Sequence, residues 1–154
     1  MKDGALGMDA DRKNQFQDWA NRELKRAERY RSFLSLVVFN LSGFLSTVGQ
    51  RKINSPDEIN RFLAGLVERV VEGARESDLV STLDNARLAL LLPETDDEAA
   101  AVAAGRFQTL ISEYLGALAG TGFNFEVPPE ITSFPGRSDQ RSLKVRLGEL
   151  EACR

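Results

Sequence analysis

Apolar residues recur every three or four positions in three long segments of the chain, which is the spacing of amphipathic helices. The segments are residues 11–31, 56–73 and about 95–119. In the first of them the apolar stripe consists of Phe16, Ala20, Leu24 and Ala27. We therefore expect three helices, each with one face against a core. Residues 1–10 have no such period, and we expect them to be a disordered lead-in.

Between these segments lie short runs that are typical of strands. Residues 33–41 (FLSLVVFNL) are almost continuously apolar, which favours a central strand buried on both faces. Residues 79–83 and 87–92 are two further runs, separated by Asp84-Asn85. Asp and Asn tolerate positive φ better than other non-glycine residues, so we expect a tight hairpin here.

Helix-start signals and proline residues set the remaining boundaries. Ser55-Pro56-Asp57-Glu58 and Thr95-Asp96-Asp97-Glu98 are capping boxes, and the first has proline at the first helical position. Residues 123–134 look extended, but Pro128-Pro129 predicts a bend or an edge position. A last short helix is expected over about residues 142–153.

The expected order is thus α-β-α-β-β-α-β-α, without an internal repeat or a low-complexity linker. Strands separated by helices, with one hairpin, imply a mixed sheet covered by helices in one α/β or α+β domain. We assign residues 11–154 to this single domain.

Composition and charge exclude several functions. The net charge of −3 gives no case for nucleic-acid binding. No apolar run approaches the length of about 20 residues that a membrane span needs. The single cysteine, Cys153, cannot form an internal disulfide and fits a cytoplasmic location. The absence of histidine removes Ser-His-Asp and Cys-His catalysis and every zinc site that uses imidazole.

Several stretches, in this order and spacing, resemble the GGDEF family of nucleotide cyclases. Residues 21–44 (NRELKRAERYRSFLSLVVFNLSGF) are similar to the family's first helix and strand. Residues 75–80 (RESDLV) and 88–96 (LALLLPETD) are similar to the segments on either side of its signature hairpin. Residues 125–135 stand where the family has another strand. The resemblance covers roughly residues 15–136. It implies an α+β, ferredoxin-like, palm-like fold with a central mixed, mostly antiparallel sheet flanked by helices.

The signature hairpin itself departs from the family pattern. In active members, paired glycines let the backbone approach GTP closely, and the acid that follows helps to bind magnesium. The signature positions are occupied here by Asp84, Asn85, Ala86, Arg87 and Leu88. The metal-binding acidic positions therefore hold alanine and arginine.

The first strand departs from the pattern as well. The resemblance puts the family's two aspartates at Asn40 and Ser42, and a lysine at Leu45. The guanine-recognising loop and the C-terminal cationic segment of the family are also unrecognisable. Because magnesium prefers carboxylate oxygens and phosphoryl transfer depends on it, we expect neither catalysis nor a bound metal or cofactor.

One motif of the family is retained. Many members have a product-binding inhibitory site with an RxxD motif five residues before the signature, and Arg75 and Asp78 match it. A second arginine from the helix after the hairpin falls on Arg106. The resemblance therefore implies a cyclic di-GMP receptor, in which arginines contact guanine and phosphate and Asp78 accepts hydrogen bonds from guanine.

Two alternatives stay open. An exposed Arg75–Asp78 ion pair at a helix-to-strand junction is common without any ligand. The domain would then be a ligand-independent interaction module that binds a partner signalling protein or forms a homodimer. The polar face of the first helix is the expected surface for such a contact.

Overall fold

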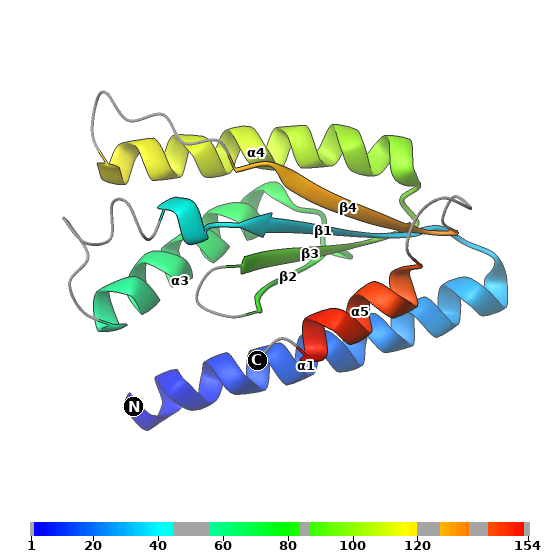
Figure 1. Ribbon diagram of the computed structural model, residues 1–154, viewed down its shortest axis with the longest axis horizontal. Coiled ribbons are helices and arrows are strands. Elements are labelled where there is room, and N and C mark those ends of the chain that lie inside the picture. Colours follow the sequence, from blue (N-terminus) through cyan, green and yellow to red (C-terminus); the bar gives the residue numbers. More distant parts are fainter. Residues whose placement is uncertain (1, 45–55, 84–86, 120–126, 136–141, 153–154) are drawn as a thin grey trace.

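The computed structural model describes residues 2–44, 56–83, 87–119, 127–135 and 142–152, and the fold is given for these residues (Figure 1). The helices and strands are α1 (Lys2–Tyr30), β1 (Leu34–Asn40), α3 (Pro56–Gly73), β2 (Leu79–Thr82), β3 (Arg87–Pro93), α4 (Asp97–Ala119), β4 (Pro129–Phe134) and α5 (Leu143–Ala152). This order confirms the predicted alternation of helices and strands. No helix in these ranges is long and apolar enough to cross a membrane.

The four described strands form one sheet in the order β2-β3-β1-β4. All neighbouring pairs are antiparallel, which confirms the α+β class. The described sheet therefore has no parallel pair of neighbours, whereas a mixed, mostly antiparallel sheet was predicted. The reason is that each helical crossover joins two parallel strands that are not neighbours. β3 lies between β1 and β2, and β1 lies between β3 and β4.

The predicted hairpin is confirmed by the pairing of β2 with β3. Thr82 lies opposite Leu88, and the Leu83 N–H donates to the Arg87 carbonyl at 2.9 Å. The turn residues Asp84, Asn85 and Ala86 lie outside the described part of the chain.

Strand β1 is buried on both faces, as its apolar run predicts. Val37 and Phe39 belong to one core, beneath α3 and α4, whereas Leu36 and Val38 belong to a second core, beneath α1 and α5. Figure 1 shows α1 and α5 together on one side of the sheet and α4 on the other. The side-chain period of two sends alternate residues to opposite cores.

Helix α5 is attached to the sheet by apolar and ionic contacts. Leu143 and Leu147 are buried in the same core as the apolar stripe of α1. Arg146, whose side chain is only 14% exposed, forms an ion pair with Glu130 of β4. It also pairs with Glu149 one turn later at 3.4 Å. The C-terminal helix is therefore part of the domain.

The starts of two helices differ from the prediction. α1 begins at Lys2, so residues 2–10 are helical where a disordered lead-in was expected. Extending an existing helix adds one hydrogen bond for each residue fixed, and Ala, Leu and Met favour this state. In α4 the capping residue is Asp96 instead of Thr95, since Asp96 Oδ1 accepts from the Ala99 N–H at 2.8 Å.

Helices α3 and α4 approach each other closely at Gly65. A Cβ at this position would collide with the hydroxyl of Tyr114, so a larger residue would require this side chain to move. That hydroxyl donates to the carbonyl of Phe62 at 3.3 Å. Burial raises the pKa of Tyr114, Glu68 raises it further and Arg69 opposes the shift, so the hydroxyl stays a donor at neutral pH.

Helix α1 ends at a residue in the left-handed conformation. Arg31 has φ of 54°, and the Ser32 N–H donates back to the Ala27 carbonyl at 3.0 Å. This is the helix-ending arrangement in which glycine is usual, because a Cβ makes positive φ costly.

We expect Arg31→Gly to raise the free energy of unfolding by about 0.5–1 kcal/mol, after the greater entropy of glycine in the unfolded chain is subtracted. The matched control is Arg29→Gly, which lies inside the last turn and should lower the free energy of unfolding by about 1 kcal/mol. Urea denaturation measures both. An equal loss of stability in the two variants would contradict this account of the helix end.

Candidate functional site

The first candidate site lies where β1 ends and β3 begins. Asn40 and Arg87 are opposite each other in the sheet. Oδ1 of Asn40 accepts from the Ser42 N–H at 2.9 Å, and this contact caps the turn that follows β1. Side chains of opposite residues on neighbouring strands begin about 4.5–5.5 Å apart. The geometry therefore brings together Asn40, Ser42 and Arg87, three of the positions at which the sequence resemblance implies that metal-binding or signature residues are replaced.

Of the remaining signature positions, Leu88 lies within the described residues. Leu88 lies opposite Phe39 and is fully buried in the core beneath α3 and α4. Asp84, Asn85, Ala86 and Leu45 lie outside the described residues. Leu88 is therefore a core residue.

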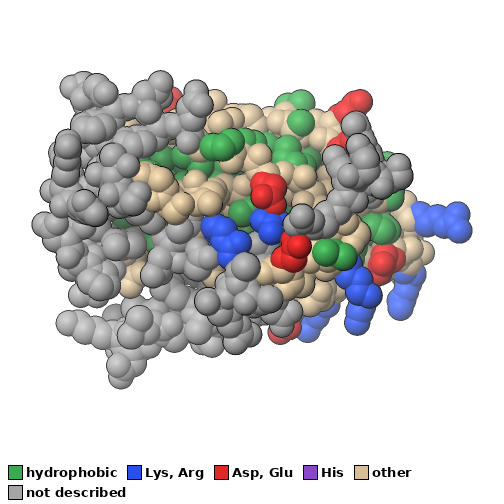
Figure 2. Space-filling view, in the orientation of Figure 1, with side chains coloured by type: hydrophobic (Ala, Val, Ile, Leu, Met, Phe, Trp, Pro, Cys, Tyr) green, Lys and Arg blue, Asp and Glu red, His purple; other side chains and the backbone are tan. Residues whose placement is uncertain are grey.

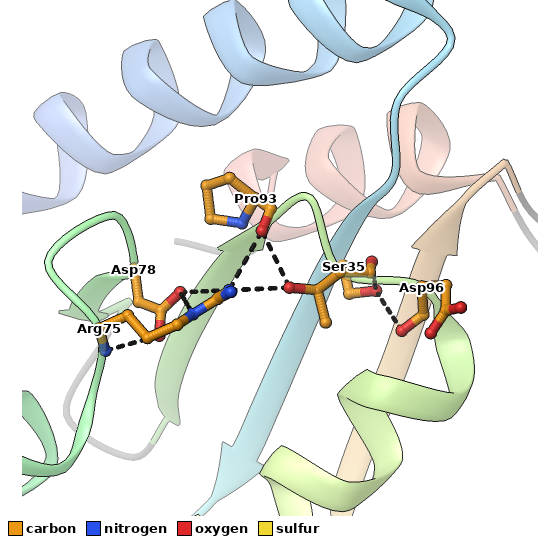
Figure 3. Close-up of polar contacts among 6 residues, drawn as sticks. Ser35, Arg75, Asp78, Pro93 and Asp96 are labelled. Atoms are coloured by element: carbon orange, nitrogen blue, oxygen red, sulfur yellow. Dashed lines mark hydrogen bonds and ion pairs between the residues drawn. The ribbon is translucent and has the colours of Figure 1, made fainter.

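The second candidate site is the Arg75–Asp78 cluster in the turn between α3 and β2 (Figure 3). The backbone N–H of Arg75 donates to Asp78 Oδ2 at 2.9 Å. Its guanidinium donates to Oδ1 from Nη2 at 2.9 Å and from Nε at 3.2 Å. The Asp78 N–H donates in turn to the Arg75 carbonyl at 3.0 Å. The spacing of three residues closes this turn, which explains why the motif folds locally.

Arg75 also reaches the junction between β3 and α4. Nη2 donates to the Pro93 carbonyl at 3.1 Å and to the Thr95 hydroxyl at 2.8 Å. Thr95 Oγ1 donates to the same Pro93 carbonyl at 2.9 Å. One guanidinium nitrogen thus joins two segments that are 18 to 20 residues apart in the sequence.

The cluster continues into the sheet through buried hydroxyl groups. Ser35 Oγ donates to the Thr95 carbonyl at 2.8 Å and lies 2.8 Å from Ser133 Oγ (Figure 3 shows Ser35 beside the Asp96 end of the network). All three hydroxyl residues are buried. Sequence analysis missed this extension. The available signal was two serines in otherwise apolar or extended strands.

The two members of the ion pair differ in exposure. The side chain of Asp78 is 2% exposed and that of Arg75 is 53% exposed. The pair is therefore not fully exposed, in contrast to the exposed Arg75–Asp78 ion pair without a ligand that the sequence left open as an alternative. Hydrogen bonds to a buried charged group stabilise a protein by about 1.5–3 kcal/mol, which is more than a surface ion pair contributes.

Arg106 lies on α4 and is exposed. Its guanidinium carbon lies 5.4 Å from the ring centre of its neighbour Phe107. Among the described contacts, none joins Arg106 to Arg75 or Asp78. The structure therefore brings together two of the three predicted ligand-binding residues.

We expect Asp78→Asn to lower the free energy of unfolding by about 1.5–3 kcal/mol, because the buried carboxylate holds Arg75 through several charge-assisted hydrogen bonds. Thr95→Val, which removes only the hydroxyl, should cost about 1 kcal/mol. The control is Glu76→Gln, an exposed neighbour, with a change within about 0.5 kcal/mol. Urea denaturation of the three variants tests this order. A loss for Asp78→Asn no greater than for the control would show that the network does not stabilise the fold.

Comparison with known proteins gives matches at the level of structure. No protein-family model matches the chain, and no curated protein matches its sequence. The active GGEEF domain of a diguanylate cyclase from Vibrio cholerae matches with a TM-score of 0.58 and 18% identity, over 80% of this chain and 75% of that chain.

Two further structures match more closely in shape. The GGDEF domain of DgcB from Caulobacter crescentus, solved in complex with c-di-GMP, has a TM-score of 0.65 at 15% identity, over 91% of this chain and 80% of that chain. The FimX GGDEF domain from Pseudomonas aeruginosa has a TM-score of 0.65 at 16% identity, over 92% and 84%. The element order, the antiparallel sheet and these matches agree: the chain has the fold of the GGDEF domains of diguanylate cyclases.

Proposed function

We propose that this domain does not synthesise cyclic di-GMP and works by binding. The support comes from the corner between β1 and β3, where the sequence resemblance puts the magnesium ligands of an active cyclase. Magnesium prefers carboxylate oxygens, and it offsets the charge of the triphosphate during phosphoryl transfer. The described side chains at these positions are the amide of Asn40, the hydroxyl of Ser42 and the guanidinium of Arg87.

The observation that carries this proposal is the cross-strand pair of Asn40 and Arg87. A divalent cation held at the end of β1 would lie next to a permanent positive charge on β3, and the two repel each other. Asn40 Oδ1, the one oxygen of its side chain, already accepts from the Ser42 backbone. The corner therefore disfavours the metal on which the reaction depends.

We further infer that the bound ligand is cyclic di-GMP and that Arg75 is its main contact. A domain of the same fold, that of DgcB, has been solved with this dinucleotide. The guanidinium of Arg75 is half exposed and is fixed in direction by Asp78. A planar guanidinium can stack on a purine and donate to guanine oxygen or to phosphate.

The contacts support different roles for the two residues of the motif. Asp78 Oδ1 and Oδ2 accept from the backbone and side chain of Arg75, and the carboxylate is almost fully buried. In this proposal Asp78 is a positioning residue, and it does not accept from guanine as the sequence resemblance implied. Nη1 of Arg75 has no hydrogen-bond partner among the described residues, so its two N–H groups are the donors offered to the ligand. Arg106 adds a second cation from α4.

A second candidate function is a ligand-independent interaction module. The observation that favours it is the exposure of large aromatic side chains on and just after α1. Trp19 is 51% exposed, Tyr30 is 68% exposed and Phe33 is 48% exposed. Aromatic residues are enriched in the contact surfaces of protein complexes.

We expect no cyclic di-GMP to form when the full chain is incubated with GTP and magnesium, because the corner lacks carboxylate ligands in the described residues. Chromatography of the nucleotide products measures this. Calorimetry should also detect no magnesium-dependent binding of GTP. Formation of the dinucleotide above the rate of an enzyme-free control would overturn the non-catalytic assignment.

We expect calorimetry to show micromolar binding of cyclic di-GMP to the wild type. Arg75→Ala should weaken it at least tenfold. Arg75→Lys should weaken it nearly as much, since lysine keeps the charge but loses the planar fork. Arg106→Ala should weaken it several-fold. The matched control is Arg69→Ala, which removes an exposed arginine from α3 and should leave the affinity unchanged.

Circular dichroism of each variant checks that a lost affinity does not come from unfolding. Equal affinity of the wild type and the folded Arg75→Lys variant would reject Arg75 as the contact. If the folded wild type shows no binding of cyclic di-GMP, the receptor function is rejected and the interaction module is the remaining candidate.

A further inference from the structure

A guanine base has one polar edge that an arginine cannot serve. Its N7 and O6 atoms are acceptors, to which a guanidinium donates, whereas its N1–H and its N2 amino group are donors. A carboxylate accepts from both donors at once, and a buried donor that lacks an acceptor weakens binding. A site that recognises guanine through Arg75 therefore also needs an acidic side chain close to this arginine.

The acidic residue of the motif is not available for this purpose. The side chain of Asp78 is only 2% exposed, and both of its oxygens accept from Arg75. Among the described residues, two exposed glutamates stand next to the cluster in the sequence. Glu76 follows Arg75 in the turn, and Glu94 lies between β3 and α4.

The contacts of Arg75 distinguish these two glutamates. Nη2, a terminal nitrogen of the guanidinium, donates to the Pro93 carbonyl at 3.1 Å and to the Thr95 hydroxyl at 2.8 Å. The residues before and after Glu94 thus both hold this nitrogen, so the guanidinium lies beside the backbone of Glu94. Glu76 adjoins the backbone of Arg75, at the opposite end of its side chain. Glu94 is therefore the glutamate on the side of the guanidinium.

The backbone of Glu94 has an unusual conformation. Its φ is 53°, in the left-handed region that a Cβ makes costly and that glycine adopts readily. Its N–H donates to the Phe33 carbonyl at 2.7 Å, which holds this conformation against the segment that enters β1. Among the described residues, its carboxylate has no hydrogen-bond or ion-pair partner. Glycine would serve the fold at least as well, so the Glu94 side chain is left for a ligand.

We propose, on the basis of the receptor function above, that Glu94 determines the base specificity of the site by accepting from N1–H and the N2 amino group of guanine. In this arrangement Nη1 of Arg75 donates to O6 of the same base, and Asp78 holds the guanidinium in place. Adenine has an amino group where guanine has O6, and a lone pair where guanine has N1–H. It would therefore set donor against donor at Arg75 and acceptor against acceptor at Glu94.

Positive charges on the surface do not make this choice of base. Figure 2 shows Lys and Arg side chains gathered along the edge formed by the C-terminal half of α1, where Arg22, Arg26 and Arg29 are exposed. Such charges attract the phosphates of every cyclic dinucleotide alike, because phosphate contacts carry no information on the base. A carboxylate repels the phosphates and favours only a base with donors. Loss of Glu94 should therefore change selectivity more than affinity.

Calorimetry with cyclic di-GMP and cyclic di-AMP measures this selectivity. The wild type should prefer cyclic di-GMP at least about tenfold, and Glu94→Gln should reduce the preference at least about fivefold. The reason is that an amide offers a donor beside its acceptor and so pairs with adenine as well. The matched control is Glu76→Gln, which removes the same charge at the other end of Arg75 and should leave the preference unchanged.

A second variant, Glu94→Gly, separates selectivity from folding. Glycine adopts a φ of 53° without strain, so the variant should unfold at a temperature no lower than that of the wild type. It should nevertheless lose the preference for cyclic di-GMP. Cyclic di-IMP, whose hypoxanthine bases lack the N2 amino group, should bind the wild type more weakly than cyclic di-GMP does. Glu94→Gly should bind these two dinucleotides alike.

The outcomes separate this proposal from the receptor function. A folded wild type that binds no cyclic dinucleotide overturns the receptor function and, with it, the role of Glu94. If Arg75→Ala abolishes the binding of cyclic di-GMP but Glu94→Gln keeps the full preference, the role of Glu94 alone is overturned. The same follows from a wild type without any preference. An equal loss of preference in Glu76→Gln also overturns it, because net charge would then explain the effect.

Discussion

The burial of β1 on both faces is the constraint on which the other elements depend. Its residues alternate between two cores, so α3 and α4 must cover one side while α1 and α5 cover the other. The strand also pairs with both β3 and β4, which fixes the register of the sheet. A shift of one residue would exchange every side chain between the cores. The positions of Asn40 at one end of the strand and Ser35 at the other follow from this register.

The sequence predicted most of the fold because the relevant signals are local. The apolar run of β1, the stripes of α1 and α3 and the two runs of the hairpin each have a period that identifies the element. Helix starts were harder to predict. Thr95 matched a capping box, but its hydroxyl is engaged with Arg75 and Pro93, and Asp96 caps α4 instead. Such competition for one hydroxyl depends on tertiary contacts.

The candidate sites were predictable to different degrees. The family resemblance of the sequence implied that acids are replaced at Asn40 and Arg87, and the sheet register adds that these two residues are opposite each other. The Arg75–Asp78 contact was also predictable, because three residues separate the partners. The burial of Asp78 and the continuation of the network to Ser133 were not predictable, because this network joins segments that only the sheet brings together.

The fold itself already uses most of the Arg75 side chain. Nε and Nη2 close the turn before β2 and hold the start of α4, whereas Nη1 has no hydrogen-bond partner among the described residues. Selection for a folded domain would by itself retain an arginine and an aspartate at these positions. Their persistence in related sequences would therefore report first on folding. Retention of a ligand would have to be sought in residues that the fold does not need, and the exposed Arg106 is such a residue.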